Sequence, residues 1–155
     1  MGRRSVAGRV IAVWNGDQFI LKTSDGRFLR TTLARRQAPP PYGETVRVVG
    51  FPETDLFRIN ISEAIWRREK IDMPPEDTPE PCNVKSLLMD DSGQQWFRPQ
   101  YFGRTLKIRG KVRDVSRMSG PKAGILLDCG KVIIPVNADT CPDALRDIGR
   151  PFAGV

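Results

Sequence analysis

The stretch GRVIAVWNGDQFILKTSDGRFLR, residues 8–30, decides the fold class of this chain. It contains three runs of β-branched and aromatic residues, separated by two turn signals, Asn15-Gly16-Asp17 and Ser24-Asp25-Gly26. Such runs between Asn-Gly and Asp-Gly turns predict three short strands joined by tight hairpins. Gly8 inside the first run predicts a strongly bent strand, because glycine within a strand often marks a bend.

Two further strands complete the first repeat of this pattern. Residues 45–50 form a β-branched run, and after a loop from Phe51 to Leu56 we expect a fifth strand from about Arg58 to Trp66. The apolar phase of that strand shifts between Ile61 and Ala64, which predicts a bulge. Five short strands with a long connection between the third and the fourth are typical of an OB barrel.

The pattern recurs about 100 residues later. Gly8-Arg9-Val10 matches Gly110-Lys111-Val112, and residues 24–29 match 128–133. Thr140 and Pro142 predict the start of a short helix over 143–148, and the sequence reaches Val155 inside the fourth strand. We therefore predict an all-β chain with two OB-like five-strand barrels in tandem. The second is truncated, and short helices lie in the linker, over 84–89, and before the last strand.

Charge divides the chain into three parts. Residues 1–70 carry 13 basic and 7 acidic side chains, residues 71–102 carry 2 and 6, and residues 103–155 carry 10 and 5. The middle part opens with four prolines interleaved with carboxylates, a composition typical of an extended linker. We expect a first barrel over 1–70, an acidic proline-rich linker with a short helix over 71–102, and an incomplete second barrel over 103–155.

Three segments carry a resemblance to a known family. They are residues 8–30, GETVRVVGFPETDLFRINISEAIWR (43–67) and GRTLKIRGKV (103–112). Their glycine and hydrophobic spacing resembles the tandem OB-like modules in the ligand-sensing regions of some bacterial sensor histidine kinases. The resemblance implies a non-catalytic sensory or docking module of a bacterial signalling protein. It carries over no functional residues.

Composition excludes several kinds of site. The chain has no His, so Ser-His and Cys-His dyads are impossible, and its three Cys lack metal-ligand spacing. Ser119 and Lys122 stand at SxxK spacing, but Gly120 and Pro121 place them in a loop rather than on a helix. We expect no enzyme activity, no cofactor and no metal site. No run of residues is long and apolar enough to predict a membrane span.

The loop between the fourth and fifth strands is the first candidate site. Loops at this place serve recognition in OB barrels. Its rings and aliphatic groups with an acidic rim favour a protein or small-molecule ligand over phosphate, and its candidate contact residues are Phe51, Glu53, Asp55, Leu56 and Phe57.

Single-stranded nucleic acid is the alternative ligand. OB barrels bind single strands with rings and cations on the second and third strands. The cations placed for this role are Lys22, Arg27, Arg30, Arg35, Arg36 and Arg58. Phe19 and Phe28 lie on the same strands, but their positions fit the barrel core as well as the outer face.

Partners and location follow from whichever interpretation holds. A sensor-kinase fragment would be extracytoplasmic, whereas a complete chain without a signal peptide would be cytoplasmic. The incomplete second barrel leaves three outcomes open. The segment 80–100 fills the missing strand, a second chain fills it in a dimer, or the half-barrel stays loose. We favour the first outcome, because Trp96-Phe97 and Tyr101-Phe102 lie immediately before the second unit and can cover apolar surface.

Overall fold

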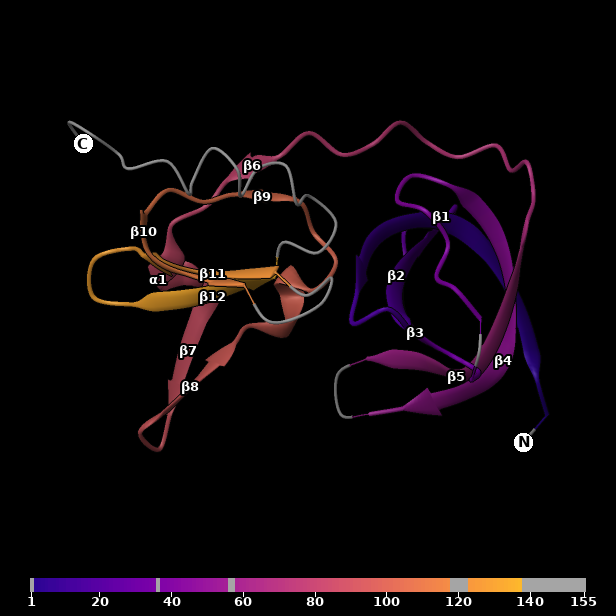
Figure 1. Ribbon diagram of the computed structural model, residues 1–155, viewed down its shortest axis with the longest axis horizontal. Helices are drawn as coiled ribbons and strands as arrows, with labels where there is room; N and C mark the ends of the chain where they lie inside the picture. The colour runs from indigo at the N-terminus through magenta and orange to yellow at the C-terminus, as the bar shows by residue number, and fades with distance from the viewer. Residues whose placement is uncertain (1, 36, 56–57, 118–122, 138–155) are drawn as a thin grey trace. The chain divides into compact units, whose positions relative to one another are not determined.

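The computed structural model describes residues 2–35, 37–55, 58–117 and 123–137 (Figure 1). The chain divides into two compact units, Met1–Asp77 and Thr78–Val155. The boundary falls inside the segment 71–102, so residues up to Asp77 belong with the first unit and the following residues with the second.

The first unit is a closed five-stranded barrel, as the sequence predicted (Figure 1). Its strands are β1 (Arg4–Trp14), β2 (Gln18–Thr23), β3 (Phe28–Leu33), β4 (Thr45–Thr54) and β5 (Ile59–Arg68). They follow the order β1-β2-β3-β5-β4, and β4 pairs back to β1. β3 and β5 run parallel, and the other pairs are antiparallel.

The length and bend of β1 close the barrel. Its first half, Arg4–Arg9, pairs with β4, and its second half, from Gly8 to Trp14, pairs with β2. A Cβ atom at Gly8 would overlap the backbone carbonyl of Lys22 and stand 3.0 Å from Leu21 Cγ. Only glycine permits this approach between β1 and β2. A bulge between Val10 and Ala12 follows two residues later, where β1 turns toward β2.

Alternation along the strands builds the core. Apolar side chains from all five strands fill the barrel interior: Val10, Phe19, Leu21, Leu29, Leu33, Val46, Val48, Ile61 and Ala64. The predicted bulge in β5 is present, because Glu63 adopts a φ of 47° and the register with β4 shifts there. This bulge keeps both Ile61 and Ala64 inside the barrel although they are three residues apart.

The strand β4 is longer than predicted. The segment Phe51–Thr54, expected as a loop, continues β4 and pairs with Ser62, Ile61, Asn60 and Ile59 of β5. The prediction was wrong because Pro52 and Glu53 resemble loop residues locally, whereas β5 supplies a partner strand for them.

The second unit contains three small sheets among its described residues. An antiparallel sheet joins β10 (Lys111–Arg117), β11 (Ala123–Asp128) and β12 (Ile133–Asn137). The two-stranded sheets are β6 (Glu80–Pro81) with β9 (Leu106–Lys107), and β7 (Leu88–Asp91) with β8 (Gln94–Phe97). The predicted helix 143–148 and the truncated fourth strand lie outside the described residues.

The hairpin β10–β11 has the same local geometry as β1–β2. A Cβ at Gly110 would lie 2.7 Å from the carbonyl oxygen of Asp128 and 2.8 Å from Leu127 Cγ. By strand register these residues are the equivalents of Lys22 and Leu21, so the sequence match of 24–29 with 128–133 is displaced by two residues at this strand. A register shift between Val112 and Asp114 also matches the one between Val10 and Ala12.

The helix over 84–89 is shorter than expected. α1 spans Val84–Leu87, and Leu88 already belongs to a strand. Val84 and Leu87 are buried with Ile134 of β12, and Tyr101 of the 3-10 turn η1 (Pro99–Tyr101) packs against them. Trp96 and Phe97 were expected to cover apolar surface, yet they are 54% and 58% exposed. They lie on the two-stranded hairpin β7–β8, which leaves both rings open to solvent.

Candidate ligand-binding face of the first barrel

The outward side chains of β1, β2 and β3 form one continuous surface, which we call the outer β1–β3 face. Cross-strand partners share a face of a sheet, so the register places its residues in three rows. These rows are Arg9, Lys22 and Phe28; then Ala12, Ile20 and Arg30; then Trp14, Gln18 and Thr32. All nine side chains are partly exposed, whereas their neighbours Phe19, Leu21, Leu29 and Thr31 are buried.

Trp14 and Arg30 form the first ring–cation pair of this face. The turn after β1, in which Asn15 and Gly16 have φ values of 57° and 75°, places Trp14 opposite Gln18. Arg30 Nη2 donates a hydrogen bond to Gln18 Oε1 over 2.7 Å. The Arg30 guanidinium carbon lies 5.9 Å from the centroid of the Trp14 ring, within reach of a cation–π interaction.

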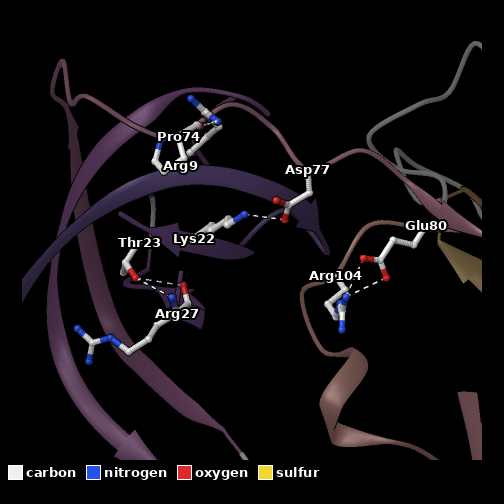
Figure 2. A network of polar contacts seen from close by, with 8 residues as sticks. All are labelled: Arg9, Lys22, Thr23, Arg27, Pro74, Asp77, Glu80 and Arg104. Atoms are coloured by element: carbon white, nitrogen blue, oxygen red, sulfur yellow. Dashed lines mark hydrogen bonds and ion pairs between the residues drawn. The ribbon is translucent and has the colours of Figure 1, made fainter. Parts of the chain in front are cut away.

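Phe28 and Lys22 form the second pair. Lys22 Nζ lies 5.7 Å from the centroid of the Phe28 ring. The two residues face each other across β2 and β3, so the ring of Phe28 belongs to the outer face and not to the core. Phe19, which was equally ambiguous in sequence, is fully buried. Lys22 also forms an ion pair with Asp77 over 2.6 Å (Figure 2).

Arg27 lies in the turn between β2 and β3, beside this face. Its backbone amide donates to Thr23 Oγ1 over 3.0 Å (Figure 2). Its Nε donates to Asp25 Oδ2 over 2.8 Å. The Thr23 hydroxyl also donates to Asp25 Oδ1. The Thr23 hydrogen bond, and then the charge of Arg27, hold the pKa of the Asp25 carboxyl below its ordinary value of 3.8. Arg27 is thus tied to the turn, with 62% of its side chain exposed.

Of the other predicted cations, Arg35 and Arg58 are not among the three rows of the face. Arg35 is exposed in the connection after β3, and Arg36 lies outside the described residues. Arg58 pairs with Asp55 at the tip of the β4–β5 hairpin, with 3.5 Å between Nε and Oδ2. Of the six predicted cations, the structure therefore brings Lys22 and Arg30 together on one surface and places Arg27 at its edge.

The predicted contact loop has its carboxylates engaged within its own hairpin. Asp55 accepts hydrogen bonds from the Arg58 backbone amide and from Asn60 Nδ2, and Glu53 accepts one from Ser62 Oγ over 2.5 Å. The Phe51 ring is 37% exposed, and the Arg3 guanidinium lies 5.2 Å from its centroid. The other two predicted contact residues, Leu56 and Phe57, lie outside the described residues.

Sequence reasoning missed Trp14, Gln18 and Arg9 as members of the face. A signal for Trp14 was available, because an Asn-Gly turn fixes which residues pair on either side of it. That turn makes Trp14 the partner of Gln18. Gln18 and Lys22 are four residues apart on β2, so their side chains, and that of Trp14, lie on the same face. Arg9 was harder to place, because the bulge between Val10 and Ala12 changes which residues of β1 face outward on its two sides.

The described residues contain free thiols but no cluster of metal ligands. Cys82 and Cys129 are free thiols, and no group of three or more His, Cys, Asp or Glu able to hold a metal ion occurs within residues 2–35, 37–55, 58–117 and 123–137. Cys141 and the Ser119–Lys122 pair lie outside those ranges. No described helix is long and apolar enough to cross a membrane.

Comparison with known proteins returned no matching family model, curated protein or solved structure.

Proposed function

We propose that the chain is a non-catalytic binding module, and that its first barrel binds an extended anionic ligand on the outer β1–β3 face. The observation that carries the proposal is the composition of this face, on which two rings each lie beside a cation, Trp14 with Arg30 and Phe28 with Lys22.

The barrel topology supports this assignment. A closed five-stranded barrel with the order β1-β2-β3-β5-β4 agrees with an OB-like fold. In OB barrels the surface of the second and third strands is the usual place for oligonucleotides and oligosaccharides. The outer β1–β3 face occupies that place.

Single-stranded nucleic acid is the ligand class that would use both the rings and the cations. A base stacked on an aromatic side chain contributes about 1–3 kcal/mol, and every base offers such a surface. Cations beside the rings would attract the phosphates that connect the bases. Trp14 and Phe28 are partly exposed, which fits this role, because the buried part of a ring limits its motion while the exposed part can contact a ligand.

Fluorescence anisotropy with a labelled oligothymidine of about 12 nucleotides, a length within the usual range for an OB barrel, tests the proposal. We expect binding in the micromolar range or weaker at low salt, with log affinity falling linearly with log salt concentration. Amide shifts in an NMR titration should concentrate on β1, β2 and β3. The absence of binding at low salt, or shifts confined to other strands, would overturn the proposal.

A second candidate function is protein docking within a bacterial signalling protein, as the family resemblance implies. The observation that favours it is an exposed apolar pair on β4 and β5, Phe51 at 37% and Ile65 at 47% exposure. Val49 pairs with Ile65, so these two residues share a face. Phe51 follows Val49 by two residues on β4, so the side chains of Phe51 and Ile65 both project from the outer surface. Retention of a purified partner by the wild type, and its loss in Phe51→Ser with an unchanged melting temperature, would distinguish this function.

We also propose that the second unit is an OB-like barrel related to the first. The support is the shared geometry of Gly8 and Gly110 and of the bulges that follow them. Hydrogen exchange tests this proposal. Slow exchange of the amides of residues 132–134 and 136, independent of protein concentration, is expected if one chain closes this unit; Pro135 has no amide hydrogen. Protection that depends on protein concentration would indicate a dimer, and fast exchange throughout would exclude a barrel.

A further inference from the structure

The segment that follows β5 touches the outer β1–β3 face at two neighbouring positions. We call residues 72–77 the acidic strap. Arg9 Nη1 donates a hydrogen bond to the Pro74 carbonyl over 2.8 Å, and Lys22 Nζ lies 2.6 Å from Asp77 Oδ2 (Figure 2). Arg9 and Lys22 are partners across β1 and β2, so both contacts fall on one row of the face.

The strap engages the cation that the proposed ligand would need. The Lys22 side chain is only 17% exposed, whereas its partner Asp77 is 53% exposed. The carboxylate thus lies outside the ammonium group, at the position from which an approaching phosphate would contact it. Lys22 is also the cation of the Phe28 pair, so the strap affects one of the two ring–cation pairs of the face.

The sequence of the strap suits a covering segment that is held weakly. Pro74 and Pro75 favour an extended conformation and have no backbone N–H, so they cannot add a strand to the sheet through hydrogen bonds of their own. Its contacts with the face are therefore made by an acidic side chain and a carbonyl oxygen. Both of these acceptors can be exchanged for phosphate oxygens.

We propose that the acidic strap is an intramolecular competitor that occupies the face until an anionic ligand displaces it. This inference rests on the proposed function of the face. A partly exposed ion pair is weak, but the strap begins only a few residues after β5, and short tethers give effective concentrations in the millimolar range. An exposed pair within a folded chain favours its contact by a factor of about 1.4 to 5, equivalent to about 0.2–1 kcal/mol, which is enough to populate the strap contact and small enough for a ligand with several phosphates to displace it.

The experiment compares two variants that remove the same charge from neighbouring residues of the strap. Asp77→Asn removes the ion pair with Lys22. Glu76→Gln is the matched control, because Glu76 is exposed and forms no hydrogen bond or ion pair with any described residue. Affinity for the labelled oligothymidine is measured by anisotropy at about 50 mM salt and at several higher concentrations, because counterion effects change strongly over this range.

We expect Asp77→Asn to bind the oligothymidine about two- to five-fold more tightly than the wild type at low salt, as the loss of one exposed pair implies. The affinity of Glu76→Gln for the oligothymidine should differ from that of the wild type by less than half of the change seen in Asp77→Asn. The gain of Asp77→Asn should shrink as salt rises, because salt also weakens the strap contact of the wild type. Equal gains in the two variants would overturn the inference, since they would report net charge alone.

A measurement without ligand separates this inference from the proposed function. In the heteronuclear NOE of the backbone amides, Glu76 and Asp77 should be ordered in the wild type and more mobile in Asp77→Asn. If the heteronuclear NOE shows that the strap is mobile in the wild type, the inference is overturned. Oligothymidine binding by the same protein would still support the proposed function. An ordered strap together with no binding by any variant overturns the function, and with it the role of the strap as a competitor.

Discussion

Arg30 donates a hydrogen bond to Gln18 across two strands of the barrel, with 2.7 Å between Nη2 and Oε1. A guanidinium group has five N–H donors, and this bond uses one of them to hold the group near Trp14. The bond gives a long side chain a defined position before any ligand arrives. Less rotamer entropy is then lost on binding, which is the general advantage of a preorganised site.

Removing the Trp14 ring should weaken oligothymidine binding more than removing any ring elsewhere on the barrel. We expect Trp14→Leu to lower affinity about 5- to 100-fold, the range implied by the loss of one stacked base. Phe51→Leu is the matched control, because its ring is also exposed and also lies near an arginine, but on β4. An equal loss in both variants, measured by anisotropy, would mean that the outer β1–β3 face is not the site.

Gly8→Ala should destabilise the first barrel by about 1–3 kcal/mol, the usual cost of forcing an extra carbon into a packed site. The new methyl group would overlap the Lys22 carbonyl, which is part of the backbone and cannot rotate away. Gly2→Ala is the control, because no atom lies within 4 Å of a Cβ built there. Urea unfolding of the two variants measures the difference, and equal midpoints would contradict the close approach of β1 and β2.

Two buried threonines should respond oppositely to substitution by valine. Thr31 Oγ1 is buried without a hydrogen-bond partner among the described residues, whereas Thr23 Oγ1 bonds to Asp25 and Arg27. A buried hydroxyl without a partner is unfavourable, so Thr31→Val should raise the free energy of unfolding by about 1 kcal/mol. Thr23→Val should lower it by a similar amount. A loss of stability in Thr31→Val, seen by calorimetry, would show that the hydroxyl is satisfied.

The lowered pKa of Asp25 predicts a pH dependence of stability. A carboxyl whose pKa is lower in the folded state contributes stability above the unfolded value, and that contribution is lost as pH falls through the folded value. Asp25→Asn should therefore be less stable than the wild type at pH 7, and the difference should close at a pH well below 3.8. An NMR titration should also show the Asp25 pKa rising in Thr23→Val. An unchanged pKa in that variant would exclude the hydroxyl as the main cause.

Local sequence signals located the strands of the first barrel, apart from the end of β4. The Asn15-Gly16 and Asp25-Gly26 turns and the β-branched runs located β1, β2 and β3, and the phase shift in β5 located its bulge. These features depend on neighbours in sequence: turn residues need particular φ values, and branched side chains favour extended backbone. The end of β4 was misplaced because pairing with β5 extends it past residues that have weak strand preference.

The candidate site depended on more distant relationships. Phe19 and Phe28 occupy similar strands with similar neighbours, and only the register of β2 with β3 and the closure of the barrel put one ring inside and the other outside. The contact of Lys22 with Asp77 joins residues 55 positions apart. The sequence by itself determined the number and order of the first barrel's strands and the place of its tight turns, because these obey local rules. The tertiary structure alone decided which side chains share the outer face and what covers them, because a strand alternates between two faces and only its distant partners determine which face is buried.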